Sequence, residues 1–163
     1  MFLYSKPHIS GSLRRGFSLV EVLVAVTIIT IAFIAVLSAS TRGVVLARLA
    51  LEETQVSFLL EEGAEAVKFA RDLNWSNISA LTLSADYHPE WGANGWTIVS
   101  GSGVSGEFTR KIQFTSAYRD SYDDLASSGT VDSGTRKVTV SVAWFNGVAT
   151  VTKNLEFYIT DIF

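Results

Sequence analysis

The chain has 163 residues, nearly half of them apolar, which is enough for one modest domain and an additional segment. Its formal charge is −3, but Lys6, Arg14 and Arg15 precede any acidic residue and leave ten basic against sixteen acidic residues for the remainder. That balance argues against nucleic-acid binding by bulk charge, and the lack of cysteine excludes disulfides, thiolate metal sites and a cysteine nucleophile.

A long uncharged segment lies near the amino terminus. From Val22 to Thr41 there is no charged residue, and about 20 apolar residues span a bilayer core as a helix. Leu, Ile, Val and Phe are spread around the whole helix, which favours lipid or a bundle of like helices over a soluble core. The basic residues Arg14 and Arg15 precede this span, so we expect a single-pass cytoplasmic membrane protein whose carboxyl end lies outside.

A secretory signal peptide is the alternative for this segment, with Ala39-Ser40-Thr41 as its cleavage site. The apolar run is longer than a typical signal peptide requires, and Glu21 interrupts it near its start. Burying that carboxylate as an ion costs about 3 kcal/mol on insertion scales. Glu21 therefore requires a partner of opposite charge.

The residues around Glu21 form a recognisable motif. Arg14 to Glu21, RRGFSLVE, resembles the processing motif of type IV prepilins and type II secretion pseudopilins. The resemblance implies that a prepilin peptidase cuts between Gly16 and Phe17 and that Phe17 is then N-methylated. It also implies that Glu21 pairs with the terminal ammonium of a neighbouring subunit. The expected partners are the peptidase and methyltransferase, other pilin or pseudopilin subunits, and an inner-membrane assembly platform, and the expected final location is a filament at the cell surface.

Amphipathic periodicity continues beyond Arg42 and predicts that the helix extends to about Asp72. The apolar positions follow steps of three, four or seven: Val45, Leu49, Val56, Leu60, Val67 and Ala70. Within this stripe Gly63 marks a kink, the close packing of a strand, or a tolerated glycine. We interpret the acidic residues Glu61, Glu62 and Glu65 as a solvated helix face rather than a metal site, since Lys68 and Arg71 lie nearby.

The carboxyl half has the period-two pattern of half-buried strands. Candidates are 96–99, 108–114, 138–144 and 151–159, and Asn146-Gly147 between the last two predicts a hairpin. Residues 79–96 are expected to form an irregular connector and 101–106 a flexible loop, with Trp75, Trp91 and Trp96 buried over the helix or sheet.

The predicted fold class is α+β and pilin-like, with a long amino-terminal helix packed on three or four antiparallel strands. The predicted divisions are a leader (1–16), a transmembrane and filament-core helix (17–41), an amphipathic helix (42–73), and a connector with the sheet (74–163).

Two groups of side chains in the carboxyl half are candidate binding sites. Asp120, Asp123, Asp124 and Asp132 supply oxygens that suit calcium, although their spacing fits no EF-hand and also suits ordinary turns. Arg110, Lys111, Arg136 and Lys137 stand at strand starts as a candidate patch for DNA, but ordinary solvated charges are the favoured interpretation. No other cofactor is expected.

The residues contain no catalytic set and no phosphate-binding loop, so we expect a structural protein rather than an enzyme. The favoured function is a minor pilin or pseudopilin of a type IV pilus-like filament. The alternatives are a binding, adhesion or DNA-uptake module that a filament presents, and a single-span membrane protein without a filament role.

Overall fold

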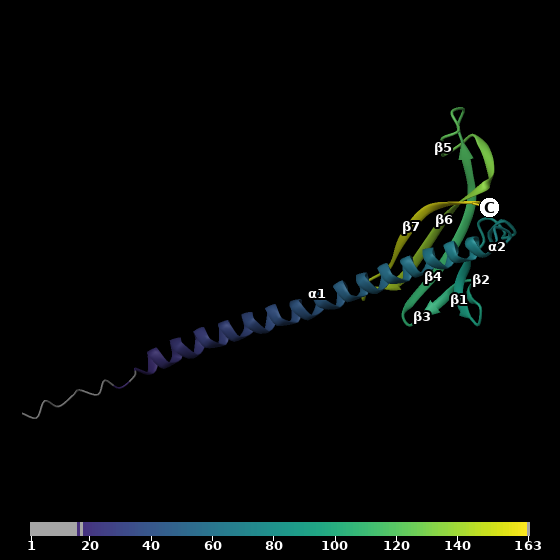
Figure 1. Cartoon of the computed structure of the whole chain (residues 1–163). Coiled ribbons are helices and arrows are strands. Elements are labelled where there is room, and N and C mark those ends of the chain that lie inside the picture. Colours follow the sequence, from purple (N-terminus) through teal and green to yellow (C-terminus); the bar gives the residue numbers. More distant parts are fainter. Residues whose placement is uncertain (1–15, 17, 163) are drawn as a thin grey trace, which may run out of the picture. The chain divides into compact units, whose positions relative to one another are not determined.

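The computed structural model describes residue 16 and residues 18–162, which form two compact units (Figure 1). One unit ends at Leu46, and the other, which we call the head, begins at Ala47. A single helix, α1 (Leu19–Leu73), contributes to both units. The prediction of one long helix ending near Asp72 is therefore confirmed.

Local interactions explain where α1 runs and where it ends. No proline lies between Leu19 and Leu73, so no backbone N–H is missing from the helical ladder. At the end of the helix, the side-chain amide of Asn77 donates to the carbonyl of Ala70 at 3.0 Å, and the N–H of Asn74 donates to the same oxygen at 3.3 Å. These donors satisfy a carbonyl that the helix itself leaves without a partner. A short helix, α2 (Ser76–Ser79), follows directly.

Seven strands form one antiparallel sheet in the head. Its main path has the order β2-β1-β4-β6-β7, and β3 and β5 pair with β4. The strands are β1 (Tyr87–Gly92), β2 (Gly95–Ser100), β3 (Gly103–Ser105), β4 (Phe108–Arg119), β5 (Leu125–Ala126), β6 (Thr130–Phe145) and β7 (Thr150–Thr160). All four predicted strands are present, as β2, β4, β6 and β7, so the α+β prediction is confirmed.

The structure corrects two expectations about the segments before β4. The connector 79–96 contains β1, which was missed because Pro89 argues against a strand. Pro89 pairs only with Ile98 of β2, while the pairing of β1 with β4 is confined to Tyr87, so the proline needs no N–H on its other side. The expected loop 101–106 likewise contains β3, which pairs with the start of β4.

The predicted hairpin at Asn146-Gly147 is confirmed as the turn between β6 and β7. Because Phe145 pairs with Thr150, the turn contains four residues rather than two. The side-chain oxygen of Asn146 accepts from the N–H groups of Val148 and Ala149, both at 3.0 Å. Gly147 has a φ of +94°, a backbone conformation that glycine adopts without strain.

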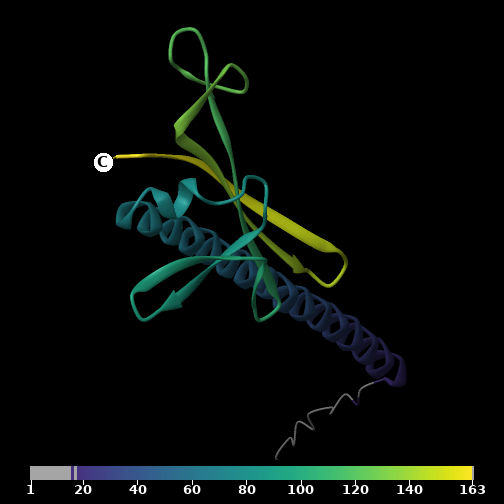
Figure 2. The ribbon, with the colours of Figure 1, turned by 90° about the vertical axis from the view of Figure 1, so that its right-hand side faces the viewer.

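The core of the head lies between α1 and one face of the sheet (Figure 2). Alternate residues of β4 and β6 point toward the helix and are buried with its apolar stripe. The stripe is confirmed from Val56 onward, whereas Val45 is exposed. The principal core residues are Val56, Leu60, Val67, Ala70, Ile112, Phe114, Val138, Val140, Val142 and Ile159.

Gly63 is the point of closest approach between α1 and β6. The helix continues through this residue, so there is no break at the glycine. A Cβ atom built on Gly63 would lie 2.7 Å from Cγ1 of Val140, which is closer than real Cβ contacts. Of the three interpretations of Gly63, the close packing of a strand is therefore the one that the structure supports.

A buried arginine lies beside this contact. Arg110 of β4 points toward α1, donates to the carbonyl of Leu59 at 3.1 Å, and pairs with Glu62 at 2.9 Å. Glu61 and Glu65 are exposed, in agreement with a solvated face, whereas Glu62 pairs with this buried cation.

The tryptophans differ in exposure. Trp75 is half-buried against the core, and Trp96 is also half-buried. Trp91 is 70% exposed at the end of the β1–β2 hairpin, so the prediction of burial is wrong for this residue. Its ring contacts Trp96 edge to face, with 5.1 Å between the ring centroids. The two indoles shield each other at the hairpin end, where the ring of Phe69 of α1 lies against Gly95.

Candidate functional site

The segment before α1 is accessible at the predicted cleavage position. Gly16 is exposed, and a Cβ built there would meet no other atom within 4 Å. The helix begins only at Leu19, and the first turn is closed by the N–H of Val22, which donates to the carbonyl of Ser18 at 3.1 Å. A peptidase must close on non-helical backbone, and Gly16 presents such backbone without a side chain. Arg14, Arg15 and Phe17 lie outside the described residues.

Glu21 stands in the first turn of α1, surrounded by apolar neighbours. The partly positive amino end of a helix favours a carboxylate at this position, but only by a few tenths of a kcal/mol to about 1 kcal/mol. The next cation along the chain is Arg42, which lies 21 positions further, or about 31 Å along the helix. The segment from Gly16 to Thr41 therefore contains no side-chain cation that could neutralise Glu21.

The segment from Leu19 to Thr41 is long and apolar enough to cross a membrane. Its large apolar side chains are exposed on all sides, from 49% at Val24 to 80% at Leu19. The threonine hydroxyl groups of this segment form hydrogen bonds within the helix: those of Thr27 and Thr30 each donate to the backbone carbonyl four residues earlier, at 2.8 Å. The segment therefore presents no unpaired threonine hydroxyl to a hydrocarbon environment.

Comparison with known families identifies this segment. Residues 11–37 match the family model of the prokaryotic N-terminal methylation motif. The chain therefore carries the leader and methylation motif of type IV prepilins, and its long apolar helix fits a pilin. The match covers the leader and the first part of the apolar helix, and the head lies beyond it. No match was found among curated proteins or among solved structures.

The motif has direct consequences for the role of the chain. It implies processing by a prepilin peptidase and assembly with other pilin subunits, and it points to a structural subunit rather than an enzyme. Together with the apolar helix, it fits a membrane-anchored pilin. The individual roles of Gly16, Phe17 and Glu21 remain predictions.

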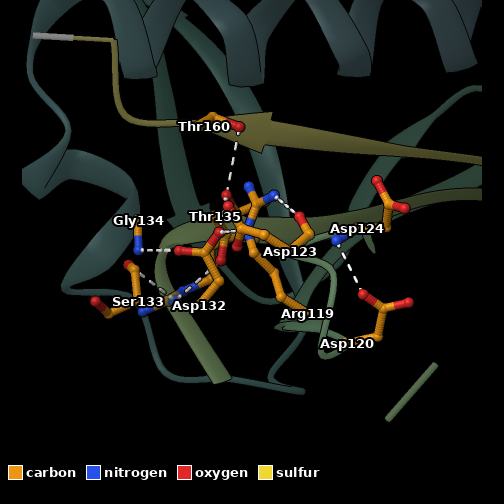
Figure 3. A network of polar contacts seen from close by, with 10 residues as sticks. Arg119, Asp120, Asp123, Asp124, Asp132, Ser133, Gly134, Thr135 and Thr160 are labelled. Carbon is orange, nitrogen blue, oxygen red and sulfur yellow. Dashed lines mark hydrogen bonds and ion pairs between the residues drawn. The ribbon is translucent and has the colours of Figure 1, made fainter. Parts of the chain in front are cut away.

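The four aspartates predicted as calcium ligands lie in what we call the arm, residues 117–134, where β4 and β6 continue past the end of β7 (Figure 3). Asp132 accepts from Nε of Arg119 at 2.7 Å, from the hydroxyl of Thr135 at 2.8 Å and from the N–H of Gly134 at 2.9 Å. Arg119 also donates to the carbonyl of Asp123 at 2.7 Å. The arginine therefore joins both sides of the arm.

Asp120 orders the outer loop of the arm together with Arg119. One of its carboxylate oxygens accepts from the N–H of Tyr122 at 2.8 Å and from the N–H of Asp124 at 3.1 Å. The hydrogen bonds explain how Asp123 is held in a left-handed conformation, with a φ of +66°. The loop is thus an ordered, hydrogen-bonded turn. Tyr122 at its outer side is 84% exposed.

Electrostatics follow this arrangement. The hydrogen bond from Arg119, followed by that from Thr135, lowers the pKa of Asp132 below its ordinary value. The hydrogen bond to Asp132 in turn raises the pKa of Arg119. Asp132 is therefore held as an anion by protein donors.

Calcium at Asp120, Asp123, Asp124 and Asp132 stays a prediction, and it would require these donors to be released. Within residues 16 and 18–162, no group of three or more histidine, cysteine, aspartate or glutamate side chains is arranged to hold a metal ion. The sequence pattern predicted these aspartates as a group but did not predict that Arg119 binds Asp132. An arginine and an aspartate on the two strands that flank one loop are a pattern that can indicate such an ion pair.

The basic residues considered for DNA do not form one surface. Arg110 points toward α1 and is buried, whereas Lys111 and Lys137 lie on the opposite face of the sheet. Lys137 pairs with Glu156 at 2.8 Å and Lys111 with Asp86 at 3.6 Å. The carboxylate of Glu156 raises the pKa of Lys137, and Lys137 lowers the pKa of Glu156.

Proposed function

We propose that this prepilin is a minor pilin or pseudopilin, which is cut between Gly16 and Phe17, methylated at Phe17, and built into a filament through its amino-terminal helix. The observation that carries the proposal is the match of residues 11–37 to the methylation motif. This segment contains the exposed Gly16 and the start of an apolar helix whose side chains are exposed. The preference for a minor subunit is supported by the absence of a cysteine staple and by the exposed Trp91.

Charge explains how processing is connected with assembly. Cleavage creates an α-amino group on Phe17, which is cationic near neutral pH. Glu21 has no side-chain cation within about 31 Å on the carboxyl side of its own helix. A neighbouring subunit that brings its own amine to Glu21 removes two unpaired charges from the membrane in one contact. The same contact gives the subunits a defined axial register.

Mass spectrometry of the mature chain tests the cleavage. In cells that contain the peptidase, the amino terminus is expected at a methylated Phe17. A Gly16→Leu variant is expected to keep the leader, because its side chain obstructs the peptidase at the bond. A mature chain that retains Met1 in such cells contradicts the proposal.

Substitution of Glu21 tests the assembly step separately. Glu21→Ala and Glu21→Gln remove the charge, so processed subunits should accumulate in the membrane while incorporation into filaments falls by about tenfold or more. Glu21→Asp keeps the charge and should retain part of the incorporation. Glu61→Gln is the matched control, since Glu61 is an exposed glutamate of the same helix within the head.

Unchanged incorporation of the Glu21 variants would favour a single-span membrane protein without a filament role. Presentation of a ligand by the filament is a second candidate function, and a cleft on the head favours it.

A further inference from the structure

The sheet has a second face, opposite α1, which we call the outer face. On β4, β6 and β7 its residues alternate with the core residues and lie directly opposite one another in rows. The rows are Thr115, Lys137 and Tyr158; Gln113, Thr139 and Glu156; and Lys111, Ser141 and Asn154. No apolar residue occurs in these rows apart from the ring of Tyr158. The outer face is therefore a polar surface rather than an uncovered core.

A cleft of about 580 Å³ is formed where the arm meets this face. The first row supplies part of its lining, and Ser116, Tyr118 and Ser127 supply further hydroxyl groups. The pairing of β4 with β6 shifts register between Ser116 and Ala117, and such a bulge redirects the side chains that follow it. Tyr118 consequently lines the same cleft as Thr115.

The lining combines flat rings with hydroxyl groups. Tyr118 and Tyr158 each offer an apolar ring and a polar oxygen, and Leu83 and Leu125 add apolar area. Thr115, Ser116 and Ser127 can donate and accept hydrogen bonds. A ligand that fits has hydroxyl groups at its edges and apolar C–H surfaces on its faces, as a pyranose ring does.

Charge decides between neutral and anionic ligands. Lys137 is the one cation in the lining of this cleft, and its ammonium group is already paired with Glu156 at 2.8 Å. Lys111, on the same face, is paired with Asp86. An incoming phosphate or carboxylate would have to compete with these carboxylates, so a neutral ligand is favoured.

A second hollow on the outer face indicates an extended ligand. It has a volume of about 340 Å³ and is lined by polar residues that include Ser102, Thr109, Lys111, Ser141 and Thr152. The row of Lys111 lies four residues along β4 from the row of Thr115, which is about 13 Å. Only the row of Gln113 separates the two hollows.

We propose that the outer face of the head binds a neutral polysaccharide chain, with Tyr118 and Tyr158 stacking on sugar rings in the cleft beside the arm. This inference goes beyond the assembly function and does not depend on cleavage or on Glu21. Arg119 and Asp132 act as positioning residues, because they hold the arm that brings Leu125 and Ser127 to the cleft.

The binding experiment uses the full mature chain in a polyoxyethylene detergent, since alkyl-glycoside detergents contain sugars that would compete. Cellohexaose, maltohexaose and N-acetylchitohexaose are titrated by calorimetry, with hexagalacturonate and single-stranded DNA as anionic comparisons. We expect at least one neutral hexasaccharide to bind at millimolar or lower concentration, and at least about tenfold more tightly than either anion.

Variants locate the binding. Tyr158→Ala should weaken binding by about fivefold or more, whereas Tyr158→Phe should retain most of it because the ring remains. Tyr122→Ala is the matched control, because Tyr122 is exposed on the arm but does not line the cleft. The thermal midpoint of each variant is measured, so that a loss of folding is distinguished from a loss of binding.

Four outcomes would overturn the proposal. The first three are the absence of binding to all three neutral hexasaccharides, a preference for either anion, and binding that survives Tyr158→Ala in a folded chain. The fourth is an effect of Tyr122→Ala equal to that of Tyr158→Ala, which would place the ligand on the arm's loop.

Discussion

Gly63→Ala sets two physical effects of known size against each other. Replacing a helical glycine by alanine ordinarily stabilises a helix by about 1 kcal/mol. At Gly63, however, the new methyl group would lie 2.7 Å from Cγ1 and 3.5 Å from Cγ2 of Val140. Val140 is fully buried, and as a β-branched residue it has few alternative rotamers. Overpacking of this kind costs about 1–3 kcal/mol, so we expect a net loss of stability of about 1 kcal/mol.

The assay is thermal unfolding of the full mature chain in detergent, followed by near-ultraviolet circular dichroism. A loss of about 1 kcal/mol lowers the midpoint by several degrees in a domain of this size. Gly43→Ala is the matched control, because a Cβ on Gly43 meets nothing within 4 Å in the same helix, and we expect no loss there.

A double mutant identifies the contact. Val140→Ala removes the two methyl groups that the new Cβ would meet, so the cost of Gly63→Ala should disappear in that background. A Gly63→Ala variant that is as stable as the unmodified chain, or more stable, would refute the close packing of α1 on β6 at this point.

Three further predictions concern the arm and the tryptophans. Folding lowers the pKa of Asp132, so its contribution to the free energy of unfolding is complete above the ordinary aspartate pKa of about 4 and is lost as the pH falls through the lower folded value. The thermal midpoint of the unmodified chain should therefore fall more steeply in this acidic range than that of Asp132→Asn. Gly129→Ala should destabilise the arm by about 1–3 kcal/mol, because φ is +142° and the new Cβ would lie 2.2 Å from the carbonyl oxygen of Arg119; loss of protection in amide hydrogen exchange at the arm measures this. Trp91→Ala should change the free energy of unfolding in denaturant by less than about 0.5 kcal/mol, and Trp75→Ala should cost at least about 2 kcal/mol.

The sequence predicted best where one periodicity persists over many residues. The helix and the strands β4, β6 and β7 each have a long apolar pattern, because one face of each is buried against the other elements. The processing motif was equally readable, since it depends on residue types at fixed spacing and not on tertiary contacts.

Short elements and pair contacts were not predictable in the same way. β1 contains Pro89, and β3 and β5 are too short to show a period, so their pairing depends on neighbours that lie far away in the chain. Trp91 is of a residue type that is usually buried, yet it stays exposed at the end of a hairpin that Phe69 of α1 contacts at Gly95. Arg110 resembles a surface residue of a strand and becomes buried because Leu59 and Glu62 offer partners.

The isolation of Glu21 from the nearest side-chain cation on its helix also bears on how a filament would grow. Under the proposed pairing, each internal subunit gives its amine to one neighbour and receives an amine from another. A row of subunits then has one unmatched carboxylate and one unmatched amine, at opposite ends, whatever its length. Each addition, the first included, neutralises one carboxylate and one amine, so every step gains the same electrostatic energy and only the cost averaged over the subunits falls with length. The two ends of the row keep open charges of opposite sign, so each end of such a filament would recognise a different group of the incoming subunit.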